Sequence, residues 1–122
     1  MEYEISVEDN KQYLFIRVHG LVTDDLLTEL IRKAAEKAHE AGVDKFLFDL
    51  RRATNQARTM TYWQVAYNLL KELGLKSSSK YALLITPERM EDYSPLETFL
   101  LNASYQSKIF IDGLEAKEWI EK

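Results

Sequence analysis

The 122-residue sequence contains no cysteine, only 4 glycines and 2 prolines, and only 2 histidines. Without cysteine there can be no disulfide, thiolate zinc site, iron–sulfur cluster or cysteine nucleophile. So little glycine and proline excludes collagen-like and disordered compositions. No apolar run approaches the roughly 20 residues that cross a bilayer, so we expect no membrane span. These absences leave few groups for catalysis, and we expect no metal and no cofactor.

The residues that are present suit one globular domain over residues 1–122. Hydrophobic residues make up 46% of the chain and charged residues 30%, and domains most often contain about 100–150 residues. The net charge is −4, which disfavours nucleic-acid binding because phosphate neutralisation supplies most non-specific affinity. Residues 1–4 include two acids and no apolar run, which is unlike a signal peptide. We therefore expect a cytoplasmic protein.

Alternation of apolar and polar residues over 2–7 and 13–19 predicts two strands joined by a polar turn, which is a hairpin. Gly20 is expected to end the second strand. The nearly continuous apolar runs 45–50, 81–86 and 108–111 predict buried strands of a parallel sheet. Residues 51–59 are expected to form a polar loop.

Four helices alternate with these strands. Thr23 caps a predicted helix that stops at Gly42, and Asp24 complements its dipole. Thr61 with Gln64 resembles a capping box for a helix that ends near residue 73. The last two predicted helices begin with residues 94–97, where Pro takes the first helical position, and with residues 112–115. The predicted order is β-β-α-β-α-β-α-β-α, an α/β fold with a small mixed sheet of five strands.

This order and four segments resemble the SpoIIAA-like family of the STAS group (sulphate transporter and anti-sigma factor antagonist domains). The segments are 18–23, 46–50, 81–85 and 109–120, the last containing Ala-x-x-Trp-Ile. The resemblance implies a binding module that is switched by phosphorylation where the third strand passes into the second helix. That switch usually lies in an Asp-Ser-Ser-Gly-like turn, which this chain lacks. Thr59 and Thr61 are the hydroxyl residues at the corresponding place.

Arg51, Arg52 and Arg58 lie in a segment, residues 50–71, that contains no acid. They should lie beyond the carboxyl end of a buried strand, where α/β sheets bind ligands. Arginine forms bidentate contacts with carboxylates and phosphates, so these residues predict a site for an anionic ligand or an acidic partner. The alternative interpretation is that Arg51 pairs with Asp49 or with a helix acid and that the rest are solvated.

Trp63 and Tyr67 lie four residues apart, off the main apolar stripe of the second helix, whereas Tyr62 belongs to that stripe. Exposed aromatic residues mark interfaces or apolar clefts. The alternative is that the sheet and neighbouring helices bury them.

We therefore expect a non-enzymatic regulatory or protein-interaction module that is homodimeric and presents the surface from Arg51 to Trp63. The alternative hypothesis is a carrier or sensor for a small acidic amphiphile, such as a lipid-like molecule, at the carboxyl edge of the sheet. Arg52 or Arg58 would then hold the acidic group, and Tyr62, Trp63 and Tyr67 would line the tail site. An enzyme is the least favoured reading, because neither histidine has a neighbouring nucleophile or paired acid in the sequence.

Overall fold

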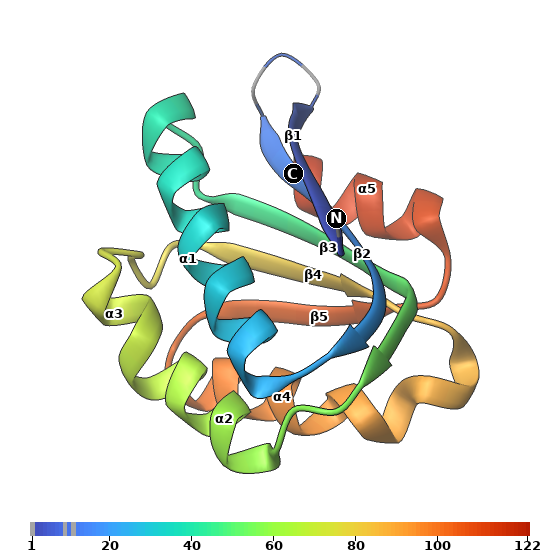
Figure 1. The fold of residues 1–122 in the computed structure, drawn as a ribbon. Helices are drawn as coiled ribbons and strands as arrows, with labels where there is room; N and C mark the ends of the chain where they lie inside the picture. Colours follow the sequence, from blue (N-terminus) through green and yellow to red (C-terminus); the bar gives the residue numbers. More distant parts are fainter. Residues whose placement is uncertain (1, 9, 11) are drawn as a thin grey trace.

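A five-stranded mixed sheet forms the centre of the molecule (Figure 1). The computed structural model describes residues 2–8, 10 and 12–122. The strands, in their order across the sheet, are β1 (Tyr3–Glu8), β2 (Tyr13–Val22), β3 (Lys45–Asn55), β4 (Lys80–Leu84) and β5 (Gln106–Phe110). The β1–β2 pair is antiparallel and the other three pairs are parallel. This arrangement confirms the predicted hairpin and the predicted fold class.

Helices cover both faces of the sheet unequally. They are α1 (Asp24–Ala41), α2 (Thr59–Gln64), the π-helical segment η1 (Val65–Leu69), α3 (Leu70–Glu72), the short 3-10 turn η2 (Pro87–Arg89), α4 (Met90–Asn102) and α5 (Gly113–Glu121). The buried residues of α1, α2, η1, α3 and α4 share one core, so we call their side of the sheet the three-helix face. Helix α5 alone covers the α5 face. Among the described residues no helix is long and apolar enough to cross a membrane.

The strand period of two sends alternate residues of β3 into different cores. Phe46 and Phe48 lie in the large core of the three-helix face. Leu47, between them, packs on the α5 face with Ala116 and Ile120 of α5. This two-sided burial explains why β3 contains a nearly continuous apolar run.

Local signals at the helix ends were predicted correctly in three places. The Thr23 side chain accepts a hydrogen bond from the Leu26 backbone N–H at 3.2 Å and caps α1. Gly42 ends α1 with a φ of 70°, the left-handed conformation that glycine adopts without strain. The Asp112 carboxylate accepts the Leu114 N–H at 2.9 Å and caps α5.

The predicted ends of two strands were wrong. Strand β2 continues through Gly20 to Val22, and β3 continues beyond Leu50 to Asn55. Residues 20–22 pair with residues 53–55, so backbone hydrogen bonds extend both strands through a segment that we expected to be a loop. Backbone pairing requires no apolar side chains, which is why the apolar pattern stopped short of the true ends.

The predicted start of α4 at Ser94 was also wrong. The helix begins at Met90, so Pro95 lies inside it rather than at its first position. Tyr93, which precedes the predicted start, is buried in the large core together with Leu96. Burial of Tyr93 therefore stabilises a helical turn ahead of Pro95, although Pro95 cannot donate a backbone hydrogen bond to the preceding turn.

Candidate functional site

The arginines of the predicted site lie on two different sides of the molecule. In the pairing of β2 with β3, Arg17 lies opposite Asp49 and His19 lies opposite Arg52. Strand β3 therefore advances by three residues where β2 advances by two. The extra residue in β3 is typical of a β-bulge, which redirects side chains. Arg51 and Arg52 are consequently both exposed, while their neighbours in β3 are buried in the large core.

Arg51 is paired as the alternative interpretation expected. Its Nε lies 2.9 Å from Asp49 Oδ1, its Nη2 lies 3.0 Å from Oδ2, and its backbone N–H also donates to Oδ1. Asp49 is only 5% exposed, and Arg17 Nε lies 3.9 Å from its Oδ2. Burial by itself would raise the pKa of Asp49, but the hydrogen bonds from Arg51 and the charges of both arginines outweigh it and lower that pKa.

Arg58 lies at the start of α2, on the three-helix side, where it contacts α1. Its Nε lies 2.7 Å from Asp24 Oδ2, and its backbone N–H donates to Asp24 Oδ1 at 2.8 Å. The Thr61 hydroxyl donates to the same Oδ1 at 2.8 Å. These contacts, first the Arg58 N–H and then the Thr61 hydroxyl, lower the pKa of Asp24. The contact therefore joins two helix starts that are far apart in the sequence.

This arrangement corrects the expected capping of α2. Arg58, not Thr61, occupies the N-cap position, and its side chain makes no capping hydrogen bond. Thr61 lies inside the helix and is only 6% exposed. Thr59, the first residue of α2, is exposed. Of the two predicted switch residues, Thr59 is therefore exposed to solvent and Thr61 is buried.

Trp63 and Tyr67 lie on the outer side of the α2–η1 helix and form part of an exposed apolar patch. Trp63 is 41% exposed and Met60 is 58% exposed. The ring centroids of Trp63 and Tyr67 are 5.1 Å apart, and those of Tyr67 and Phe99 of α4 are 6.4 Å apart. We call these four residues, Met60, Trp63, Tyr67 and Phe99, the apolar patch. A shallow hollow lies among Thr59, Met60, Trp63 and Phe99.

Two members of the apolar patch were missed by the sequence analysis. Met60 precedes Trp63 by three residues and Tyr67 by seven, a spacing that places all three on one helix side. That spacing could have identified Met60. Phe99 comes from α4, and only the packing of α4 beside α2 brings it to the patch.

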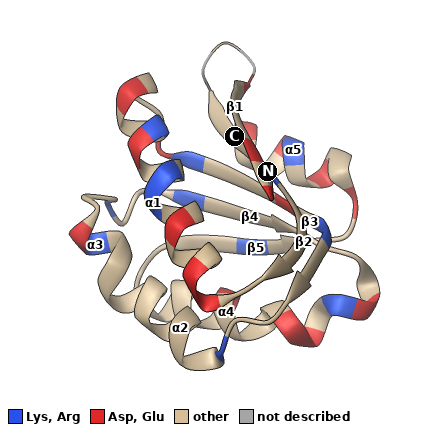
Figure 2. Ribbon diagram, viewed as in Figure 1, with Lys and Arg blue, Asp and Glu red and all other residues tan. Residues whose placement is uncertain are grey.

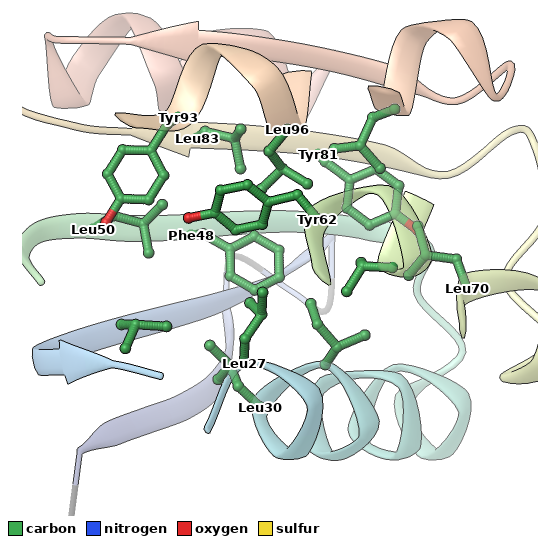
Figure 3. A pocket seen from close by; sticks show the side chains of 14 residues that line it. Leu27, Leu30, Phe48, Leu50, Tyr62, Leu70, Tyr81, Leu83, Tyr93 and Leu96 are labelled. Carbon is green, nitrogen blue, oxygen red and sulfur yellow. The ribbon is translucent and has the colours of Figure 1, made fainter. Parts of the chain in front are cut away.

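Tyr62 points the opposite way from Trp63, into the core. It is 2% exposed and lines a cavity under α2 (Figure 3). The predicted site is thus divided into three places: Arg51 and Arg52 near Asp49, Arg58 with the outward aromatic residues, and Tyr62 inside. Among the described residues, no group of three or more histidine, aspartate or glutamate side chains could hold a metal ion.

Solved structures share this fold. An uncharacterized protein of the DUF3478 family with a SpoIIAA-like fold, from Shewanella loihica, is 18% identical with a TM-score of 0.60, over 97% of this chain and 93% of that one. The anti-sigma factor antagonist SpoIIAA in its unphosphorylated form is 14% identical, with a TM-score of 0.57 over 97% and 96% of the two chains. The Bacillus cell fate determinant SpoIIAA in its phosphorylated form is 14% identical, with a TM-score of 0.58 over 97% and 98%.

These likenesses show that the chain has a SpoIIAA-like fold, as the resemblance in sequence implied. No family model matches the sequence. No curated protein matches it either. The shared fold extends over nearly the whole chain.

Proposed function

We propose that this protein is a non-enzymatic, regulatory interaction module whose apolar patch binds a partner protein. The observation that carries the proposal is the exposure of Met60 and Trp63 side by side on α2, with Tyr67 and Phe99 completing the surface. Aromatic residues and methionine are enriched in protein interfaces and often dominate their affinity. The similar fold of SpoIIAA, an anti-sigma factor antagonist, supports a regulatory role.

The charge around the patch indicates what kind of partner fits. Figure 2 shows no acidic residue along α2, whereas α1 and α5 carry several. Arg58, at the start of α2, is bound to Asp24 through Nε but its side chain is 76% exposed. The charge of Arg58 is already balanced by Asp24, so a partner that presents apolar side chains would meet an apolar surface with no net charge at its edge on α2.

Thr59 supplies a means of regulating this surface within the same proposal. It is exposed and lines the hollow of the apolar patch. A phosphate there would place a charged, hydrated group inside an apolar interface, and would weaken docking of the partner. Arg51 and Arg52 are not part of this surface, because both belong to β3, where Arg51 binds Asp49 and Arg52 lies opposite His19 of β2.

The proposal is tested by placing a photo-crosslinking amino acid at position 60 or 63 in the native host, with position 118 as the control. Glu118 is exposed on α5, which covers the other face of the sheet. We expect positions 60 and 63 to capture the same protein and position 118 to miss it. With the purified partner, Trp63→Ala should weaken binding at least about tenfold, and Thr59→Glu should weaken it more than Ser77→Glu, a control in an exposed loop.

Two outcomes would contradict the proposal. One is capture of the same proteins from all three positions, because the patch would then have no selectivity. The other is crosslinking only to a second copy, with a dimer in light scattering, which would make the patch the interface of the homodimer that the sequence led us to expect.

A further inference from the structure

A polar groove separates α1 from the helix that runs through α2, η1 and α3. It has a volume of about 260 Å³, measured as the space open to the centre of a water-sized sphere. An enclosed cavity of about 150 Å³ admits benzene, so the groove has room for a molecule of about six to ten non-hydrogen atoms. Polar residues outnumber apolar ones in its lining, which consists of Thr28, Arg32, Thr61, Gln64, Asn68 and Glu72, with Val65 and Leu69.

Contacts at both ends hold the two walls of the groove in place. At one end, Asp24 of α1 accepts hydrogen bonds from the Arg58 backbone N–H and the Thr61 hydroxyl, each at 2.8 Å. At the other end, His39 Nε2 of α1 lies 2.7 Å from the Leu73 carbonyl oxygen, just after α3. Figure 1 shows that both helices start at the same end of the molecule. The groove is therefore formed before any ligand enters, which lowers the cost of binding.

The walls place polar side chains opposite one another. The α2–α3 wall presents them at a helical spacing of three or four residues: Thr61, Gln64, Asn68 and Glu72. Counting about 1.5 Å per residue from the Asp24 contact places Arg32 about 12 Å along α1 and Asn68 about 10 Å along the other helix. Arg32 and Asn68 are therefore at similar heights in the groove, and Glu72 lies about 6 Å beyond Asn68.

Arg32 and Glu72 bring opposite charges to the groove without neutralising each other. Among the described residues, neither side chain makes an ion pair or a hydrogen bond. Arg32 also borders a second hollow, whose other charged residues are Asp25, Glu29, Lys33 and Glu36. These acids would repel a multiply charged anion such as phosphate. The groove therefore suits a ligand that carries one positive and one negative charge.

The α2–α3 wall is irregular along the groove. The π-helical segment η1 supplies three of the lining residues, Val65, Asn68 and Leu69. Val65 and Leu69 are buried and form an apolar floor beneath the polar side chains. Single π-helical turns inside α-helices are frequent at functional sites. This irregularity is independent of the charges of the groove and occurs at the same place.

We propose that this groove binds a free amino acid with an uncharged polar side chain. The Arg32 guanidinium pairs with the ligand carboxylate and the Glu72 carboxylate pairs with the ligand ammonium. The amides of Gln64 and Asn68, which each offer donors and an acceptor, hydrogen-bond the ligand side chain. The site is distinct from the apolar patch, because none of the patch residues lines the groove. Either proposal can therefore fail without the other.

The test uses three probes that differ in one charged group: L-glutamine, L-glutaminamide, which lacks the carboxylate, and 4-carbamoylbutanoate, which lacks the ammonium. Binding is followed on the full chain by NMR of the nitrogen-15-labelled side-chain amides of Gln64 and Asn68. We expect L-glutamine to shift both amides saturably, with a Kd of about 1 mM or tighter. The other two probes should bind at least about tenfold more weakly, because each lacks one charged contact.

Variants assign the two charged contacts. Arg32→Gln should weaken L-glutamine binding at least about tenfold and leave L-glutaminamide binding unchanged. Glu72→Gln should weaken L-glutamine binding similarly and leave 4-carbamoylbutanoate binding unchanged. Both residues are exposed, so these variants should fold. Lys33→Gln and Glu36→Gln are the matched controls, because they remove the same charges from exposed positions that border only the second hollow.

The proposal is overturned if L-glutamine does not shift the Gln64 and Asn68 amides saturably, or if all three probes bind with equal affinity. It is also overturned if Lys33→Gln weakens L-glutamine binding as much as Arg32→Gln does, since the effect would then be one of overall charge. Shifts confined to the Trp63 side chain would place the ligand at the apolar patch and equally exclude the groove as the site.

Discussion

On the α5 face the buried carboxylate of Asp49 receives three hydrogen bonds from Arg51. On the three-helix face three buried tyrosine hydroxyls, those of Tyr62, Tyr81 and Tyr93, make none with the described residues. The two faces also differ in how closely their apolar side chains are packed. The small cluster under α5 contains Ala116 and Ile120, both 0% exposed, while the large core contains a cavity. A single helix can settle closely onto a sheet, but three helices must also pack against one another. Space and unsatisfied polar groups therefore remain on the more crowded face.

The largest expected effect comes from truncating one apolar side chain on each face. Ile120→Ala should lower the free energy of unfolding by about 4 kcal/mol, because it empties a closely packed site. Leu27→Ala should cost less, about 2–3 kcal/mol, because Leu27 already borders open space and makes fewer contacts. Urea unfolding of both variants measures the difference. An equal or larger loss for Leu27→Ala would show that the two faces are packed alike.

Removing the charge of Asp49 should have the next largest effect. Asp49→Asn should destabilise the fold by about 1–2 kcal/mol, because it weakens hydrogen bonds to a charged partner at a buried position. Asp24→Asn is the matched variant at the more exposed contact with Arg58, and its loss should be smaller because solvent screens that pair. Equal losses from the two variants would mean that burial does not distinguish the two contacts.

The same aspartate should make stability depend on acid pH. The pKa of Asp49 in the folded state lies below its ordinary value of 3.8, so the unfolded state binds a proton at a higher pH than the folded state does. The stabilisation is fully present above 3.8 and is lost as the pH falls through the lowered folded-state value. Urea unfolding at several pH values between about 6 and 2 should show a shallower acid dependence in Asp49→Asn than in the wild type. Identical slopes would contradict the assignment.

The smallest effects should come from tyrosine hydroxyls. Tyr62→Phe removes a group without a partner and should leave stability unchanged or raise it slightly. Tyr3→Phe removes a hydroxyl that donates to Glu29 at 2.8 Å and should cost about 0.5–1 kcal/mol. Thermal unfolding of the two variants compares them directly. A clear loss for Tyr62→Phe would reveal a bound water or ligand at its hydroxyl.

Much of the fold could be predicted because its signals are local. The caps at Thr23 and Asp112 and the stop at Gly42 depend on side chains within a few residues. Each predicted helix and strand exists in the structure, in the predicted order. The errors lie where pairing between distant segments adds structure, as in the extension of β3 to Asn55, or where burial of one side chain moves a boundary, as Tyr93 does for α4.

The candidate site was predictable only as a region of the sequence. The acid-free segment marks the start of α2, where Trp63 is exposed and Tyr67 beside it is half-buried against the large core. No local pattern shows that a bulge leaves the consecutive residues Arg51 and Arg52 both exposed, or that Arg58 contacts Asp24. Both depend on which segments become neighbours after folding.

The sequence by itself determined the elements, their order and the type of sheet, because periodicity and capping act over one or two turns of chain. Only the tertiary structure decided that Tyr62 and Trp63, consecutive residues, serve different surfaces, that Phe99 joins the apolar patch, and that the large core retains a cavity. These features depend on how the side chains of several helices pack together on one sheet. Such packing involves residues that are far apart in the sequence, so no local pattern predicts it.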